Sequence, residues 1–219
     1  MINLPINEVL EGDCRELVKQ IPDGSIDLIF TDPPYIKKFM YLYDWLSDEA
    51  PRILKPNAFL LTYVGTYWKY DVMQKMARNW EYYFDFILLN AGNSPIMWTR
   101  KVISRHKSII AYRKPEDTNA HPRTNVLSFW VGGGQDKRYH TWGQDESSAR
   151  YYIDCFSKRD DLVFDPFCGG GTTAAVCKTI GRNFITCDVN HATLETARAR
   201  VSATQMVMDL PTNLQVVML

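Results

Sequence analysis

Short apolar runs alternate with amphipathic stretches along almost the whole 219-residue chain. Parallel strands need a crossover of a dozen or more residues, usually a helix, so this alternation is typical of an α/β sheet. The pattern predicts a mainly parallel sheet with helices on both faces. The predicted strands are residues 8–10, 26–30, 58–64, 82–89, 108–112, 162–164 and 183–187. The predicted helices are residues 14–20, 41–53, 70–80, 147–156, 173–180 and 192–206.

Length and composition favour an ordinary globular protein. Residues 1–219 suit a single domain, and 46% hydrophobic with 23% charged residues excludes a disordered or coiled-coil chain. No apolar run approaches the roughly 20 residues that cross a bilayer, and the start of the chain lacks the pattern of a signal peptide. We therefore expect no membrane association and a cytoplasmic location, bacterial or in the host cytoplasm if the source is viral.

Charge and metal-ligand patterns narrow the function further. Lys plus Arg equals Asp plus Glu at 25 each, so a surface for nucleic acid must be local. The five cysteines and four histidines show neither Cys-x-x-Cys nor the spacing of metal ligands. The sequence therefore predicts no metal and no disulfide framework.

Residues 98–141 form a basic segment, rich in turn residues, that is predicted to be irregular. They hold nine Lys and Arg residues against three Asp and Glu, a net charge of +6 that leaves −6 on the rest of the chain. Such a concentration of cations with interleaved Trp and Tyr is a candidate nucleic-acid surface. A solvated loop region is the alternative.

The first of two loops with predicted chemistry is residues 31–35, Thr-Asp-Pro-Pro-Tyr, directly after a predicted strand. Two consecutive prolines end the strand and leave the Pro33 carbonyl without a ladder partner. Asp32 stands at the carboxyl end of a parallel strand, where open α/β sheets bind ligands. A carboxylate and a carbonyl together accept both hydrogens of an exocyclic amine, and Tyr35 can stack on the base that carries it. A plain strand-ending turn is the alternative.

The second loop is residues 165–173, Asp-Pro-Phe-Cys-Gly-Gly-Gly-Thr-Thr, between a predicted strand and a predicted helix. Its glycines let the backbone approach a ligand, and the helix N-terminus presents free N–H groups. It is neither a P-loop nor Gly-x-Gly-x-x-Gly. One strand later, Asp188 lies where a carboxylate binds the ribose hydroxyls of a nucleoside-containing cofactor, or alternatively it caps a helix.

Together the two loops resemble those of the S-adenosylmethionine-dependent DNA amino methyltransferases, in the permuted beta group whose catalytic motif precedes the cofactor motif. The likeness covers nearly the whole chain, since residues 11–29 resemble the lead-in to the catalytic loop and residues 140–144 the segment before the cofactor motif. This chain departs from the common Gln-Lys-Pro form with Gln-Asp-Glu at 144–146. The resemblance implies a Rossmann-like methyltransferase fold with a seven-stranded sheet, in which strand 108–112 runs antiparallel.

The resemblance also implies residue roles. Asp32, Pro33, Pro34 and Tyr35 would be catalytic and position the amine of a base flipped out of the duplex. The glycine turn would hold the methionine part of the cofactor, Asp188 the ribose and Asp13 the adenine. The full set of implied cofactor residues is Asp13, Asp32, Asp165, Phe167, Cys168, Gly169, Gly171, Thr172 and Asp188. A sulfonium is already an activated methyl donor, so the implied reaction needs no metal.

Within this family, Asp at the first motif position goes with adenine N6 and Ser more often with cytosine N4. Asp32 therefore predicts N6-adenine methylation of DNA, of the kind found in restriction-modification systems, and argues against the Asn-led motif that marks protein amide methylation. Cytosine N4 and an RNA amine stay as alternatives because the chemistry at these amines is so similar. An inactive protein that binds cofactor or nucleic acid is the alternative from another class.

The expected partner is double-stranded DNA. With the resemblance, the basic segment becomes the candidate recognition region, and its small size predicts a short or loosely defined target site. The predicted phosphate contacts are Lys37, Lys38, Arg100, Lys101, Arg123, Lys137 and Arg138. The apolar residues 207–208 and 216–219 near the C-terminus are a candidate homodimer contact, with packing on the core as the alternative.

Overall fold

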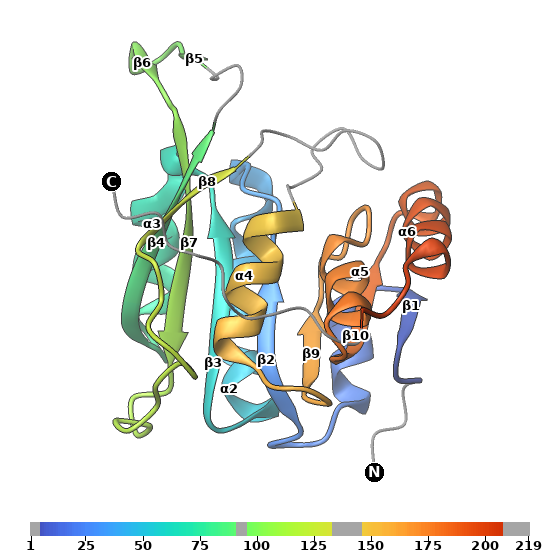
Figure 1. Cartoon of the computed structure of the whole chain (residues 1–219). Coiled ribbons are helices and arrows are strands. Elements are labelled where there is room, and N and C mark those ends of the chain that lie inside the picture. The colour runs from blue at the N-terminus through green and yellow to red at the C-terminus, as the bar shows by residue number, and fades with distance from the viewer. Residues whose placement is uncertain (1–4, 91–95, 133–145, 208–219) are drawn as a thin grey trace.

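The fold is given by a computed structural model that describes residues 5–90, 96–132 and 146–207. An eight-stranded sheet has the order β1-β10-β9-β2-β3-β7-β4-β8 (Figure 1). Its strands are β1 (Glu8–Glu11), β2 (Ile26–Thr31), β3 (Leu54–Val64), β4 (Glu81–Asn90), β7 (His106–Arg113), β8 (Phe129–Gly132), β9 (Leu162–Asp165) and β10 (Asn183–Asp188). A separate hairpin pairs β5 (Ile96–Met97) with β6 (Val102–Ile103).

Six α-helices lie in the described ranges. They are α1 (Cys14–Leu17), α2 (Tyr41–Ile53), α3 (Lys69–Met76), α4 (Glu146–Phe156), α5 (Thr172–Thr179) and α6 (His191–Ala203), with 3₁₀ turns η1 (Val18–Gln20), η2 (Lys37–Phe39) and η3 (Thr66–Trp68). The helices α3 and α6 end earlier than the sequence predicts. No helix in the described ranges is long and apolar enough to cross a bilayer.

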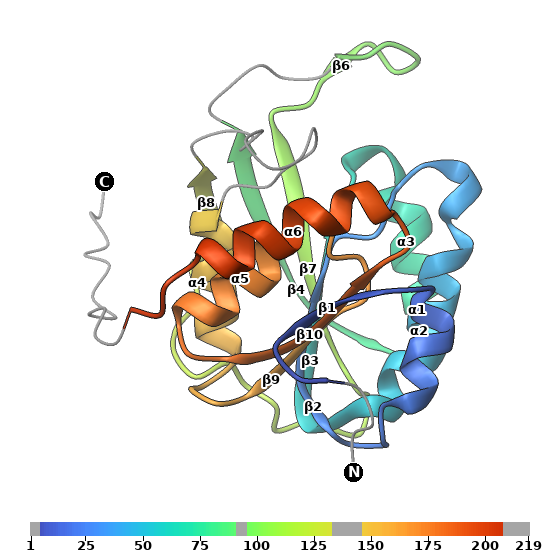
Figure 2. The ribbon, with the colours of Figure 1, turned by 90° about the vertical axis from the view of Figure 1, so that its right-hand side faces the viewer.

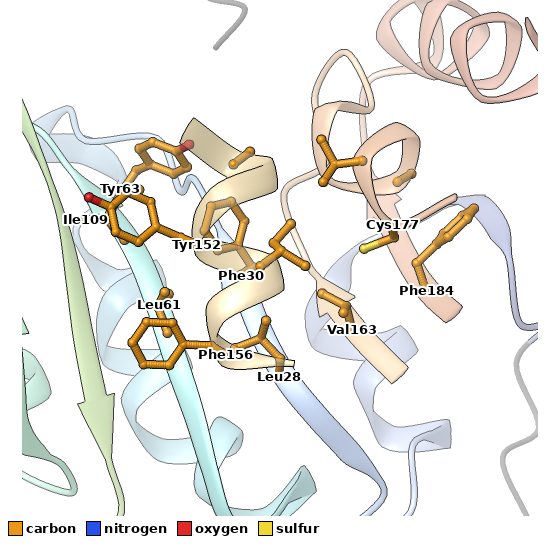
Figure 3. Close-up of a cluster of buried hydrophobic side chains, with 14 of the residues drawn as sticks. Leu28, Phe30, Leu61, Tyr63, Ile109, Tyr152, Phe156, Val163, Cys177 and Phe184 are labelled. Atoms are coloured by element: carbon orange, nitrogen blue, oxygen red, sulfur yellow. The ribbon is translucent and has the colours of Figure 1, made fainter. Parts of the chain in front are cut away.

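The helices cover both faces of the sheet (Figure 2). Because side chains alternate along a strand, Leu28 and Phe30 of β2 pack toward α4, α5 and α6, whereas Ile29 packs toward α2 and α3. Figure 3 shows side chains from the sheet and from α4, including Tyr152, meeting in the first of these clusters. Each fully buried side chain of this size contributes about 1.5–3 kcal/mol to folding. The predicted α/β architecture is confirmed.

All seven predicted strands are present, and β8 is an eighth that the sequence analysis did not predict. It pairs in parallel with β4, with Phe129 opposite Ile87. Within the segment 98–141, β7 corresponds to the predicted strand 108–112. The prediction that the rest of this segment is irregular is wrong for β6 and for β8. The strand is only four residues long and lies at the sheet edge, where Phe129 and Val131 are exposed. Its hydrophobic pattern is therefore too weak to distinguish a strand from a loop.

The strand β7 runs antiparallel to both of its neighbours, β3 and β4, as predicted. Its first residues consequently lie at the edge where the parallel strands end. Ser108 pairs with Val64, the last residue of β3. Residues at the start of β7 thus reach the same edge as the loop that follows β2.

The apolar C-terminal segment lies mostly outside the described residues. The backbone N–H of Val207 donates to Thr179 O (3.0 Å), so the chain still contacts the end of α5 at that point. The segment 140–144, which resembles the lead-in to the cofactor motif, also lies outside the described residues.

Candidate active site

The two loops lie side by side at the carboxyl edge of the sheet. β2 and β9 pair in parallel through Leu28–Val163 and Ile29–Phe164, so the loops that follow them start next to each other. At the ends of the two strands the hydroxyl of Thr31 donates to Oδ1 of Asp165 (2.7 Å). The loops are thereby brought together although 134 residues separate these two positions.

Asp165 anchors the second loop from beneath. It is 3% exposed and also accepts a hydrogen bond from the backbone N–H of Phe167 (3.1 Å). Burial raises the pKa of Asp165 to about 6, against the opposing effect of hydrogen bonds from Thr173 and Thr31. This carboxylate therefore holds the loop in shape from inside the protein.

The glycines of the second loop serve different purposes. Gly169 has a left-handed φ of 46°, and a Cβ placed there would meet no atom within 4 Å, so the turn has open space in front of it. Gly171, with φ 77°, lies against α6, where a Cβ would come 2.9 Å from Cβ of Ala197. The first glycine leaves room for a ligand and the second permits close helix packing.

Asp188 supports the glycine turn. Its Oδ2 accepts from Gly169 N (3.0 Å) and its Oδ1 from Asn190 N (2.9 Å). The side chain that caps α6 is Asn190, which accepts from Thr193 N, so the reading of Asp188 as the side-chain helix cap is wrong. A carboxylate has about four acceptor positions, and these two bonds leave capacity for a further donor.

Asp13 lies on the same edge as Asp188, because β1 pairs with β10 and Gly12 N donates to Asp188 O (3.0 Å). The Asp13 carboxylate caps α1 by accepting from Arg15 N (2.9 Å) and forms an ion pair with the Arg15 guanidinium. A hydrogen bond from that guanidinium lowers the pKa of Asp13. Asp13 is thus fixed near the predicted cofactor edge.

Two aromatic side chains and one thiol also lie at this edge. The ring of Trp45, on α2, meets the ring of Phe167 edge to face at 6.1 Å between centroids. Cys168 is buried, and burial raises the pKa of its thiol well above the ordinary value, so it stays protonated and acts as a small apolar group.

The sequence analysis missed Arg200, which holds the glycine loop from α6. Its side chain is 4% exposed and donates to Gly170 O (3.0 Å) and Thr172 Oγ1 (2.9 Å). It also forms an ion pair with Glu146 at the start of α4. An arginine inside a helix has no local signal for such a role, because only tertiary packing brings it to the loop.

In the first loop, Asp32 is paired with a residue that the sequence analysis did not connect to it. Nζ of Lys107, on β7, lies 3.1 Å from Oδ1 and 2.9 Å from Oδ2 of Asp32. The neighbouring Tyr35 ring packs on the end of β3, where a Cβ on Gly65 would lie 2.7 Å from Cδ2 of Tyr35. Burial, followed by the charge of Asp32, raises the pKa of Tyr35, which keeps the phenol neutral. Pro33 is buried and Pro34 half-buried between them.

Four of the predicted phosphate contacts lie at the edge that carries the two loops. Lys37 and Lys38 are exposed on η2, directly after the first loop. Arg100 and Lys101 are exposed in the turn of the β5–β6 hairpin, which projects beyond the sheet at this end (Figures 1 and 2). The Arg100 guanidinium stacks 4.6 Å from the ring centroid of Tyr67.

Arg123 does not reach this edge. It donates to the carbonyl oxygens of Asp154 and Ser157 at the end of α4, which leads into the start of β9 at the opposite edge of the sheet. Arg123 therefore lies away from the two loops, and its role as a phosphate contact stays a prediction. Lys137 and Arg138 lie outside the described residues. Within the described ranges, no three His, Cys, Asp or Glu side chains gather as a metal site would require.

A family model described as DNA methylase, for the N6_N4_Mtase family, matches residues 26–199, which include both loops. The chain belongs to this DNA methylase family. It is thus a DNA methyltransferase of the N6/N4 type. Curated relatives include the type II methyltransferase M.HinfI of Haemophilus influenzae, 27% identical over 91% of this chain and 69% of the relative. M.HpaI of Haemophilus parainfluenzae is 25% identical over 88% of this chain and 73% of its own length.

Solved structures share the fold of this methylase. The M1.HpyAVI–SAM complex matches with a TM-score of 0.72 at 22% identity, covering 89% of this chain and 98% of that one. The cytosine-N4-specific PvuII DNA methyltransferase matches with a TM-score of 0.74 at 18% identity, covering 88% and 85% of the two chains. Likeness at this level of identity establishes the Rossmann-like methyltransferase fold.

Proposed function

We propose that this methylase transfers a methyl group from S-adenosylmethionine to the N6 amine of an adenine flipped out of double-stranded DNA. The observation that carries the proposal is the meeting of the Asp32 loop and the glycine loop through the hydrogen bond from Thr31 to Asp165. A methyl donor on one loop and an amine on the other would be neighbours. Proximity of this kind is the main requirement when the donor is already activated.

The second loop fits the cofactor. The open space before Gly169 admits a ligand close to the backbone, and Asp188 retains acceptor capacity for ribose hydroxyls. Phe167, with Trp45 against it, offers an apolar wall for the methionine part. S-Adenosylmethionine supplies an electrophilic methyl group, and two of the solved relatives in fold are complexes with it.

The first loop fits the amine. The Asp32 carboxylate and the Pro33 carbonyl would accept the two amine hydrogens and favour a more tetrahedral nitrogen, while Tyr35 stacks on the base. Asp32 would also offset the positive charge that develops on nitrogen as its bond to the methyl carbon forms. Flipping the base out of the duplex costs a few kcal/mol, and phosphate contacts from Lys37, Lys38 and the β5–β6 hairpin would help to offset this cost.

Adenine is favoured over cytosine by Asp32 at the first position of the motif, through the family resemblance. The cytosine-N4-specific PvuII enzyme shares the fold, so the fold itself does not distinguish the two bases. The adenine N6 and cytosine N4 amines are each adjacent to a ring nitrogen, and each can donate to the same hydrogen-bond acceptors. The identity of the methylated nucleoside therefore distinguishes adenine from cytosine as the target base.

The test is to incubate the full chain with unmethylated genomic DNA and labelled S-adenosylmethionine, digest the DNA to nucleosides, and identify the labelled product by mass spectrometry. We expect N6-methyladenine, and its loss in Asp32→Asn. The matched control is Asp48→Asn, since Asp48 lies exposed on α2 and its contacts with Arg78 and Asn79 are at the surface. Label in N4-methylcytosine would contradict the base assignment. Transfer to RNA alone, or cofactor binding without transfer, would contradict the DNA substrate or the enzymatic activity.

A further inference from the structure

A largely buried ammonium group lies against the Asp32 loop. It belongs to Lys107, the second residue of β7, which pairs with Leu88 of β4. Because β7 is antiparallel to β3, its first residues lie at the edge where β2 and β3 end. The long lysine side chain then reaches from β7 to Asp32, which directly follows β2.

The ammonium is enclosed by one carboxylate and two aromatic rings. Nζ of Lys107 contacts both oxygens of Asp32, at 3.1 and 2.9 Å, and lies 4.9 Å from the ring centroid of Tyr35. It lies 4.3 Å from the ring centroid of Tyr63, a fully buried residue of β3. The Lys107 side chain is only 14% exposed. Carboxylate hydrogen bonds and ring faces are both favourable surroundings for a cation.

Electrostatics also favour the pairing of Lys107 with Asp32. A lysine and a carboxylate withdrawn from water each incur a desolvation cost that a close partner offsets. Burial lowers the pKa of Lys107, and the charge and hydrogen bond of Asp32 act in the opposite direction. The other ionisable groups that interact with Asp32 are the phenols of Tyr35 and Tyr43, whose pKa values burial raises, and the carboxyl of Asp165.

Asp165 adds a second negative charge to the same edge. The charge of Asp32 is among the causes that raise the pKa of Asp165, so the two carboxyls interact. Two negative charges in a partly buried site repel each other, and a cation bound to one of the carboxylates reduces this repulsion. Lys107 is the described residue whose ammonium contacts Asp32 directly.

We propose that Lys107 is a positioning residue for methyl transfer, which holds Asp32 by both carboxylate oxygens so that the remaining acceptor positions of the carboxylate face the target amine. The proposal rests on the proposed function. A carboxylate has about four acceptor positions, so the two contacts from Lys107 and the hydrogen bond with the Tyr35 side chain still leave capacity for the amine hydrogen. Without Lys107, the Asp32 carboxylate would populate additional orientations that cannot bind the amine.

The kinetic test compares Lys107→Met, which keeps a long side chain without charge, with Lys107→Arg, which restores a cation. We expect kcat for DNA methylation to fall about 10- to 100-fold in Lys107→Met, as small misplacements of catalytic groups do, and to recover in part in Lys107→Arg. The Kd for S-adenosylmethionine should stay within about twofold, since Lys107 contacts Asp32, Tyr35 and Tyr63 rather than the glycine loop. The matched control is Lys19→Met, because Lys19 also pairs with a carboxylate, Glu16 at 2.7 Å, but is exposed.

A second readout needs no activity. The pH titration of Lys107, followed by NMR of its labelled Cε, should move to a lower midpoint in Asp32→Asn, because the counter-charge that favours the ammonium is removed. An unchanged midpoint would show that the pair does not form in solution and would overturn the proposal. An unchanged or higher kcat in Lys107→Met would also overturn it, since the ammonium would then merely fill the pocket before the base enters. A wild-type chain that transfers no methyl group contradicts the proposed function alone, and the titration then decides the pairing.

Discussion

The hydroxyl of Thr31 donates a 2.7 Å hydrogen bond to the carboxylate of Asp165, although 134 residues separate the two in the chain. Thr31 ends β2, immediately before Asp32, and Asp165 ends β9, shortly before the glycines of the second loop. This hydrogen bond between two buried side chains, together with the pairing of β2 with β9, therefore holds the two loops side by side. Its partners are well suited to this, because a bond to a charged acceptor is stronger than a neutral one.

Thr31→Val should weaken this link while preserving the shape of the side chain. We expect a loss of about 2 kcal/mol in unfolding free energy and weaker binding of S-adenosylmethionine, because the Asp165 carboxylate loses a buried donor. Urea unfolding and calorimetric titration measure the two effects. Thr124→Val, at an exposed loop position, serves as the control. Unchanged cofactor affinity in Thr31→Val would argue against a link between the loops.

The raised pKa of Asp165 predicts a specific pH dependence of stability. Burial raises it from 3.8 to about 6, so between these values the folded protein holds the proton more tightly than the unfolded chain does. The stabilising contribution of this proton is complete below pH 3.8 and is lost as the pH rises through about 6, an effect of about 3 kcal/mol. Asp165→Asn should remove this dependence, so the difference in unfolding free energy between variant and wild type should shift in favour of the variant from pH 4 to 7. Parallel curves would contradict this.

The two glycines of the cofactor loop should respond differently to alanine. Gly171→Ala places a Cβ 2.9 Å from Ala197 Cβ at a φ of 77°, so α5 and α6 must separate, and we expect about 2 kcal/mol or more of destabilisation. Gly169→Ala meets no neighbour, and its φ of 46° costs about 1 kcal/mol, but its methyl group occupies the predicted cofactor space. Thermal unfolding and cofactor titration on both variants check this. Equal losses of stability, or full cofactor binding by Gly169→Ala, would contradict the division of roles.

Gly65→Ala should impair catalysis without unfolding the protein. Its φ of −66° suits alanine, but the added Cβ would lie 2.7 Å from Cδ2 of Tyr35 and must push the ring away. We expect kcat to fall about tenfold while the melting temperature changes little. Steady-state kinetics with a melting curve measure both, and an unaltered kcat would mean that the position of the Tyr35 ring is unimportant.

The sequence alone determined the fold class, because the alternation of apolar and amphipathic stretches is a local pattern that specifies strands, helices and their parallel connection. It also identified both loops, since Asp32 with its prolines and Asp165 with its glycines are contiguous in the chain. The antiparallel direction of β7 was implied by the family resemblance, and the pairing of β7 with β3 and β4 confirms it.

Only the tertiary structure decided which side chains serve the loops from elsewhere. Lys107 and Arg200 are an ordinary strand lysine and an ordinary helix arginine by sequence, and strand order together with helix packing carries them to Asp32 and Gly170. The same holds in the opposite sense for Arg123, whose charge suggested DNA but whose place at the end of α4 removes it from the site. A local sequence pattern indicates the secondary structure that a segment adopts. A contact between residues distant in sequence depends instead on the order of the strands and on the packing of the helices.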